Sequence, residues 1–238
     1  MSRIEAEPGY ILHRRAYRET SLILEILTAQ HGRLGVVARG VQRRKGGAEV
    51  LQQFRPLVFT IGGRGELLTL AHCEPAGRTH LLAGERLYSG MYANELVMRF
   101  AHRADPNEDL YRSYMACLAA LAGDAPLEAV LRRFELALLE ACGYALQLTG
   151  TADTHEPIEP GRTYHYAVER GPLPQPPPTQ RSVAVPGAVL LALGGETVLE
   201  ADDLPHAKRL LRFVLRHYLG DKPLASRTLF EGGAAGGS

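Results

Sequence analysis

The fold is decided by residues 9–39, which read GYILHRRAYRETSLILEILTAQHGRLGVVAR. This stretch holds three runs rich in apolar and β-branched residues: Gly9–Ala16, Thr20–Thr28 and Leu34–Arg39. Short polar turns separate the runs, as is typical of strands joined by hairpins. The stretch therefore predicts the first three strands of a small β-structure.

Two more runs of the same kind complete this β-structure. They are Leu57–Ile61 and Glu66–Cys73, and the glycine-rich turn 62–65 joins them into a hairpin. A longer basic loop, residues 40–47, separates the third run from the fourth. Five short strands fit a small closed barrel, and we expect an OB-fold. An SH3-like barrel is the alternative that periodicity leaves open.

Beyond residue 80 the apolar period changes from that of strands to that of helices. Three amphipathic stretches of roughly four turns each begin near Tyr88, Leu110 and Leu127. A last helix is expected from about Asp203 to Leu219, because Gly220 supplies a stop signal. Helices with short connections favour a compact bundle.

Between residues 150 and 200 the apolar residues follow neither the period of strands nor that of helices. Five prolines occur within the nine residues from Gly171 to Thr179, which predicts a loop or polyproline stretch rather than a core element. Thr163–Val168 and Ser182–Val185 are the candidates for short strands in this region.

These patterns predict an α+β protein, in which an N-terminal OB-fold β-barrel precedes an α-helical domain with a small irregular or β insertion. The expected domains are a nucleic-acid-binding barrel over 1–80, a helical domain over 81–149 and 201–231, an insertion over 150–200, and a flexible tail over 232–238.

Charge is distributed unevenly along the chain, although the net charge is only +1. Up to residue 80 there are 12 basic and 7 acidic residues, whereas the remainder has 15 basic and 19 acidic residues. This asymmetry predicts a polyanionic partner for the barrel, and a solvated basic surface is the alternative. The cations expected to contact nucleic acid are Arg14, Arg15, Arg18, Arg33, Arg39, Arg43, Arg44 and Lys45.

The basic loop after the third run is the strongest signal for nucleic-acid binding. Its glycines let the backbone flex while its guanidinium groups pair with phosphates. OB-folds combine such basic grooves with stacking aromatic residues. Tyr10, Tyr17, Phe54 and Phe59 are candidates for stacking, but Tyr10 and Phe59 fit the core better. A second basic surface is expected on the last helix, at Arg209, Arg212 and Arg216, unless this is only a solvated face.

A search for catalytic chemistry finds no motif. The sequence has no Gly-Lys-Ser/Thr phosphate loop, no His-Glu-x-x-His and no Gly-x-Ser-x-Gly. Cys73, Cys117 and Cys142 are widely spaced, which argues against a zinc ribbon and a disulfide framework, and favours a reduced cytoplasmic protein. Asp153, His155 and Glu156 are interpreted as a polar loop. We therefore expect a protein without catalytic activity, metal, cofactor or membrane span.

Six stretches, in order from about residue 9 to residue 230, carry a resemblance to a known family. They are Glu19–Leu22, Gly62–Glu66, Tyr88–Leu96, Leu131–Leu139, Gly143–Tyr144 and Tyr218–Arg227. Together, at these spacings, they resemble the bacterial RecO recombination mediators. Many members carry a cysteine quartet that binds zinc after the central helices. Here no cysteine follows Cys142, so the chain resembles the zinc-free branch.

The resemblance implies a function in DNA repair and homologous recombination. RecO-like proteins bind single- and double-stranded DNA and promote annealing. They also bind the acidic C-terminal tail of single-stranded DNA-binding protein (SSB), and with RecR they help load RecA onto SSB-coated DNA. The implied location is the cytoplasm, in association with the nucleoid.

The resemblance also assigns an SSB-tail site to the third amphipathic stretch, at Leu131, Arg132 and Phe134. An arginine suits this site because its planar guanidinium group can donate two hydrogen bonds to one carboxylate. The alternative is that Arg132 only braces its own helix through Glu128 and Glu135, which lie one turn away on either side.

Two other functions remain as alternatives. The barrel alone does not separate RNA from DNA, so an RNA-binding OB-fold protein is the first, and only the resemblance favours DNA. The second is a metal-dependent nuclease, for which Asp105, Glu108 and Asp109 are the nearest carboxylate cluster. This cluster is better interpreted as the acidic bias of a helix start.

Overall fold

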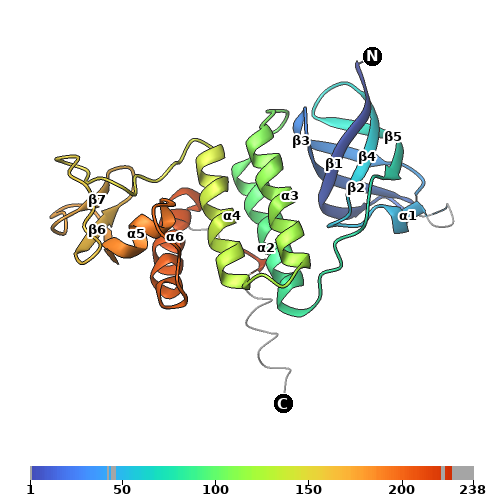
Figure 1. Ribbon diagram of the computed structural model, residues 1–238. Helices are drawn as coiled ribbons and strands as arrows, with labels where there is room; N and C mark the ends of the chain where they lie inside the picture. Colours follow the sequence, from blue (N-terminus) through green and yellow to red (C-terminus); the bar gives the residue numbers. More distant parts are fainter. Residues whose placement is uncertain (1, 42, 44–46, 221–222, 227–238) are drawn as a thin grey trace. The chain divides into compact units, whose positions relative to one another are not determined.

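The computed structural model describes residues 2–41, 43, 47–220 and 223–226 (Figure 1). The chain divides into two compact units. The first unit comprises Met1–Asp124 together with the residues from Leu224 onward, and the second unit comprises Ala125–Pro223. The four-part division of the sequence given above stays a prediction.

The first unit begins with a closed five-stranded barrel. Its strands run in the order β1-β2-β3-β5-β4 around the barrel (Figure 1). All neighbours are antiparallel except β3 and β5, which are parallel. This arrangement confirms the predicted OB-fold rather than the SH3-like alternative. The strands are β1 Ser2–Tyr17, β2 Ser21–Thr28, β3 Gly32–Ala38, β4 Leu57–Gly63 and β5 Leu67–Pro75.

Strand β1 closes the barrel because it pairs with two neighbours. Its first half pairs with β4 and its second half with β2, and the register shifts between Ile4 and Glu7 and between Ile11 and His13. Such irregularities bend a strand and increase its twist, which lets one long strand serve two partners.

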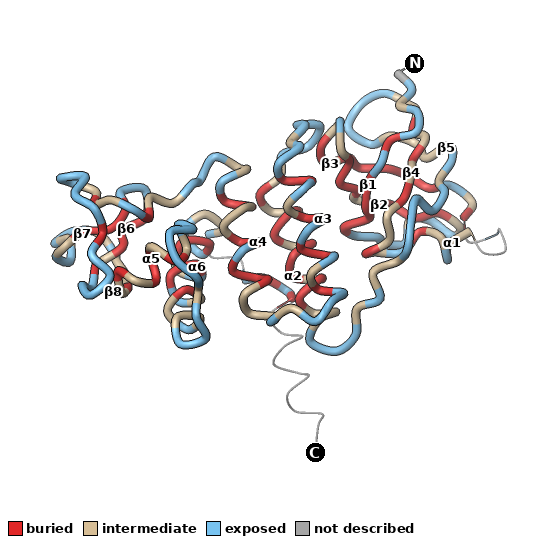
Figure 2. The backbone as a smooth tube through the Cα atoms, in the orientation of Figure 1, coloured by how far each residue is buried: buried red, intermediate tan, exposed pale blue. Residues whose placement is uncertain are grey.

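The barrel interior is the apolar core of this part of the chain. The buried residues lie along β1, β2, β3 and β4 (Figure 2), and the partly buried Leu68, Leu70 and Cys73 of β5 pack against them. Tyr10 and Phe59 are 4% and 0% exposed, which confirms the expectation that both are core residues. Phe54 is buried as well, so of the four aromatic candidates for stacking only Tyr17 is not buried.

The basic loop ends in a short helix, α1 Gly47–Val50. Arg14 joins this helix to the barrel, because its Nη1 donates to the carbonyls of Leu51, at 3.0 Å, and Ala48, at 3.3 Å. Arg44 and Lys45 lie outside the described residues.

Two helices, α2 Gly84–Phe100 and α3 Glu108–Ala122, complete the first unit. Helix α3 begins at Asn107, whose Oδ1 accepts a hydrogen bond from the Leu110 amide at 2.8 Å. Asn94 of α2 connects both helices to the barrel. Its Nδ2 donates to the Leu12 carbonyl at 2.9 Å, and its Oδ1 accepts from the Tyr114 hydroxyl at 2.6 Å.

After the second unit, the chain returns to helix α2 of the first unit. The Glu95 carboxylate accepts hydrogen bonds from the amides of Ala225 and Ser226, each at 2.9 Å, and from the Ser226 hydroxyl at 2.8 Å. Leu224 and Ser226 are 2% and 4% exposed. Three donors on one carboxylate therefore fasten this returning segment to the first unit.

The second unit combines helices with a small sheet. The sheet has the strand order β7-β6-β8, and helix α6 packs against α4, α5 and β8. The last predicted helix and both predicted short strands are confirmed. The elements are α4 Leu127–Ala141, β6 Thr163–Ala167, β7 Gly171–Leu173, β8 Ser182–Pro186, α5 Gly187–Leu193, the 3₁₀ turn η1 Ala201–Asp203, and α6 Leu204–Leu219.

The proline-rich stretch differs in part from the prediction. Gly171, Pro172 and Leu173 form strand β7, and all three residues are buried. Proline has no amide hydrogen to donate, but β7 is an edge strand of its sheet, where a missing donor is tolerated. The prediction of a loop without core residues was wrong for these three positions.

The helices expected to form one bundle belong to different units. Helices α2 and α3 are in the first unit, and α4 and α6 are in the second. Among the residues that the structure describes, no helix has the length and apolar character needed to cross a membrane.

Candidate nucleic-acid interface

Strand register gathers the basic residues at one end of the barrel. Leu22 of β2 pairs with both Ala16 of β1 and Ala38 of β3. The turn after β1 and the segment after β3 are therefore neighbours at the same end, which we call the basic end. It carries Arg15, Arg18, Arg39 and Arg43.

All four of these arginines are exposed, and none has an ion pair within the described part of the chain. The Arg18 guanidinium lies over the Tyr17 ring at 5.2 Å from the centroid, so this pair presents both a cation and an aromatic face. Exposed cations that are not paired with a carboxylate are available to an anionic ligand. The basic end therefore has the chemistry of a phosphate-binding surface.

Two of the expected cations have other contacts. Arg14 is exposed next to the basic end, but its guanidinium is already bonded to α1. Arg33 is partly buried opposite Leu27, and it pairs with Glu25 at 3.5 Å. Arg39 lies six positions further along the chain, which corresponds to roughly 20 Å of extended strand. Burial lowers the pKa of Arg33, although Glu25 opposes this effect.

The basic end also contains a hollow that sequence analysis did not predict. It has a volume of about 270 Å³ and lies between β3, α1 and β5. Its formation depends on the parallel pairing of β3 with β5, in which Val37 lies opposite Thr69. The residues that line it are Ala38, Arg39, Val41, Gly47, Val50, Leu51, Leu70, Ala71, His72 and Cys73.

The predicted second basic surface lies on α6 in the second unit. Arg209, Arg212 and Arg216 are all exposed. Arg209 donates through Nη2 to the Ala184 carbonyl of β8, so it also stabilises the unit. Arg212 and Arg216 have no ion pair within the described residues.

The expected SSB-tail residues lie on α4 of the second unit. Leu131 and Phe134 are buried, and the Arg132 side chain is 4% exposed. Arg132 Nη2 lies 2.7 Å from Glu135 Oε1, and Nη1 lies 3.8 Å from Glu128 Oε2. These are the two carboxylates that the bracing alternative named.

The bracing contacts do not satisfy the whole guanidinium. Nε and Nη1 of Arg132 have no hydrogen-bond acceptor among the described residues. Buried donors of this kind are costly unless a partner accepts from them. Glu128 is shared, because its Oε1 also pairs with Lys208 Nζ of α6 at 2.7 Å. Arg132 therefore combines an ion pair with unused donor capacity.

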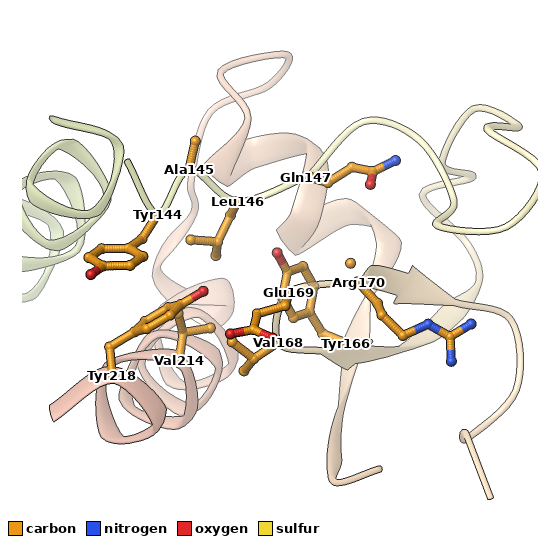
Figure 3. Close-up of a pocket in the computed structure, with 11 residues that line it drawn as sticks. Tyr144, Ala145, Leu146, Gln147, Tyr166, Val168, Glu169, Arg170, Val214 and Tyr218 are labelled. Carbon is orange, nitrogen blue, oxygen red and sulfur yellow. The ribbon is translucent and has the colours of Figure 1, made fainter. Parts of the chain in front are cut away.

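A second hollow, in the second unit, has different chemistry. Figure 3 shows Tyr144 beside Tyr218, whose ring centroids are 4.2 Å apart, in a hollow of about 170 Å³. Its charged residues, Glu169 and Arg170, pair with His217 at 3.4 Å and Asp153 at 2.8 Å, respectively. This hollow has no excess of positive charge, so it does not fit a polyanion.

The candidates for metal chemistry have structural contacts. Glu108 and Asp109 lie in the first turn of α3 and pair with Arg112, in agreement with the helix-start interpretation. No group of three or more His, Cys, Asp or Glu side chains that could hold a metal ion occurs among the described residues.

Two family models match the chain. The model described as Recombination protein O N terminal matches residues 1–78, and the model described as Recombination protein O C terminal matches residues 81–228.

Curated relatives match over nearly the whole length. The chain is 45% identical to a protein of Methylococcus capsulatus named DNA repair protein RecO, over 97% of this chain and 94% of the relative. It is 42% identical to proteins of the same name from Nitrosococcus oceani and Alkalilimnicola ehrlichii. Each of these alignments covers 96% of this chain, and they cover 94% and 92% of the relatives, respectively.

Proposed function

The chain belongs to the RecO family of DNA repair proteins, and we propose that it mediates homologous recombination by binding single- and double-stranded DNA and promoting annealing. The observation that supports this proposal best is the basic end of the barrel. Four exposed arginines lie there without acidic partners in the described chain. Because the proposal requires binding and not bond cleavage, it needs no catalytic residue, metal or cofactor.

The proposed DNA contacts in the barrel are made mainly to phosphates. Each phosphate that a cation neutralises releases counterions, which makes binding dependent on salt and nearly independent of sequence. Arg33 is the weakest member of the set, because Glu25 already pairs with it. The proposed contact residues are Arg14, Arg15, Arg18, Arg33, Arg39, Arg43, Arg44 and Lys45, with Arg209, Arg212 and Arg216 as a second surface.

Salt-dependent binding tests the basic end. Replacing Arg39, Arg43, Arg44 and Lys45 by alanine should weaken binding to unrelated oligonucleotides about equally. It should also flatten the plot of log affinity against log salt, by about 0.7 for each lost contact to a single-stranded phosphate. Fluorescence anisotropy at several salt concentrations measures this slope.

A matched pair of variants controls for net charge. The Arg15→Ala/Arg39→Ala variant should reduce the slope. Arg3→Ala/Arg64→Ala has the same change in charge within the same barrel, and it should leave the slope unchanged. Arg3 pairs with Glu5, and Arg64 lies in the turn after β4. An unchanged slope in folded basic-end variants would move the DNA site elsewhere, with Arg209, Arg212 and Arg216 the next candidates.

We further propose that the chain binds the acidic C-terminal tail of SSB through Leu131, Arg132 and Phe134. The resemblance to the family suggested this role. The buried donors Nε and Nη1 of Arg132 support it, because the described residues provide no hydrogen-bond acceptor for either of them. By the same family assignment, the protein works with RecR in the cytoplasm, at the nucleoid, to load RecA onto SSB-coated DNA.

A tail peptide distinguishes binding from bracing at Arg132. Arg132→Ala should lower the affinity for a labelled SSB-tail peptide by about tenfold or more, as expected for a lost charge-assisted hydrogen bond. Binding to naked DNA should stay near normal. Lys208→Ala is the control, because it removes the other partner of Glu128 and leaves the guanidinium in place. Equal peptide affinities for wild type and Arg132→Ala would remove Arg132 from the site.

A further inference from the structure

The hollow between β3, α1 and β5 combines apolar walls with a basic neighbourhood. We propose that it accepts one unpaired base of single-stranded DNA while the arginines of the basic end hold the flanking phosphates. The inference rests on the proposed function, because it assigns a base-binding subsite to the same surface.

The position of the hollow favours a nucleic acid as its occupant. Arg39 belongs both to its lining and to the basic end. Since Val37 of β3 lies opposite Thr69 of β5, the next residues of the two strands run side by side along the hollow. A strand whose phosphates contact Arg39 therefore passes close to the hollow.

The lining suits the faces of a base. Val41, Val50, Leu51 and Leu70 provide apolar contacts from three different segments of the chain. The volume of about 270 Å³ lies slightly below the roughly 300–1,000 Å³ of sites for drug-sized ligands. The hollow therefore fits one ring system rather than a stacked pair of bases. Bases inside a duplex are already stacked and paired, so only an unpaired base can enter.

The charge of the residues that line the hollow argues against a basic peptide as its occupant. None of the described residues that line the hollow is Asp or Glu, and Arg39 and His72 are among them. Burial, with a contribution from Glu74, raises the pKa of the Cys73 thiol to about 12, so this side chain is neutral at physiological pH. The lining itself presents no carboxylate to a basic peptide segment, because Glu74, which lies 3.5 Å from His72, does not line the hollow. An anionic strand with an apolar base matches both properties of the hollow.

The test compares two ligands with the same phosphates. Oligothymidylate and an oligonucleotide of equal length made only of abasic tetrahydrofuran sites are each titrated into the full-length protein. Wild type should bind oligothymidylate about tenfold more tightly, because base contacts add to the phosphate contacts. The slopes of log affinity against log salt should be the same for both ligands.

Aliphatic variants locate the base within the protein. Ala71→Leu and Cys73→Leu each add bulk to the lining, and each should abolish the preference for oligothymidylate without changing the salt slope. Ala16→Leu is the matched control. Ala16 is also exposed and lies at the same end of the barrel, but it does not line the hollow. This control should keep the full preference. Aliphatic side chains are used because a new aromatic ring could itself stack on a base.

The outcomes separate this inference from the proposed function. If wild type binds both oligonucleotides equally well, DNA binding stands and the base subsite is wrong. A preference that survives in both folded variants would place the base elsewhere and also overturn the proposal. If neither oligonucleotide binds, the proposed function itself fails. Should one variant not fold, the other variant and the wild-type comparison still decide the question.

Discussion

Asn94 is a buried amide that ties three elements of the first unit together. It is 2% exposed, it donates to the Leu12 carbonyl of β1, and it accepts from the Tyr114 hydroxyl of α3. Both partners are buried, so neither has water as a ready substitute. A polar side chain is tolerated at this buried position because both its amide nitrogen and its amide oxygen have hydrogen-bond partners.

Replacing Asn94 should therefore destabilise the first unit. Asn94→Ala leaves the Leu12 carbonyl without this donor and the Tyr114 hydroxyl without this acceptor, and it should lower the free energy of unfolding by about 1–3 kcal/mol. Tyr114→Phe removes only the hydroxyl and should cost about 0.5–1.5 kcal/mol. Urea unfolding followed by circular dichroism measures both values. A cost for Asn94→Ala no larger than that for Tyr114→Phe would show that the bond to Leu12 contributes little.

Single residues also show where prediction from sequence reaches its limit. The alternation of apolar residues placed Tyr10 and Phe59 in the core, and both are buried. The sequence gives no sign that Arg33 pairs with Glu25, because that contact crosses between two strands. Composition identifies cations, but only the fold separates those with partners from those that are free to bind.

At the scale of elements, the attachment of the segment Leu224–Ser226 to helix α2 through Glu95 should depend on pH. Burial alone would raise the pKa of Glu95, but the hydrogen bonds from Ser226 and Ala225, together with Arg99, lower it below its ordinary value of 4.5. A carboxylate with a lowered pKa stabilises the folded form above the ordinary value. This stabilisation is lost as the pH falls through the lowered pKa.

We therefore expect the segment Leu224–Ser226 to detach from α2 only in acid, below pH 4.5. The amide resonances of Ala225 and Ser226 in NMR spectra should move together, with a midpoint below the ordinary glutamate pKa. Glu95→Gln has no ionisable group and should show no such midpoint. A midpoint at or above 4.5 in wild type would contradict the stabilising role of these hydrogen bonds.

Some elements are easier to predict from the sequence than others. The strands of the barrel and the long helices repeat their apolar period several times, so their positions follow from the sequence. Helix α5 has only seven residues, which is too short for a clear helical period. Strand β7 contains Pro172, a residue that argues against a strand unless the strand is known to lie at an edge. The hollow was missed because it depends on the parallel pairing of β3 and β5, which are far apart in sequence.

At the scale of the whole molecule, the cysteines are dispersed rather than clustered. Cys73 lies in β5, Cys117 is buried in α3, and Cys142 follows α4 in the second unit. The region after α4 is organised instead by Thr151, which is 2% exposed. Its amide donates to the Glu156 carbonyl at 2.9 Å, and its Oγ1 accepts from the Glu156 amide at 3.1 Å.

We therefore expect the purified protein to contain no stoichiometric zinc. Elemental analysis should find well below one zinc per chain, and a chelator should leave the melting temperature unchanged. Thr151→Ala should lower the melting temperature instead, because it removes the hydroxyl that accepts from the Glu156 amide. One equivalent of zinc that survives dialysis would contradict this expectation.

The return of the chain to α2 also has a consequence for synthesis on the ribosome. Glu95 and the Ala225 amide that it accepts from are 130 residues apart, and all of Ala125–Pro223 is translated between them. At about 5–20 residues per second, this delay is roughly 7–26 seconds. By the end of that time every residue of the second unit has been made, while the first unit still lacks its last segment. The second unit, whose synthesis starts later, can therefore finish folding before the first unit. The Glu95 carboxylate remains without the amides of Ala225 and Ser226 until synthesis reaches Ser226.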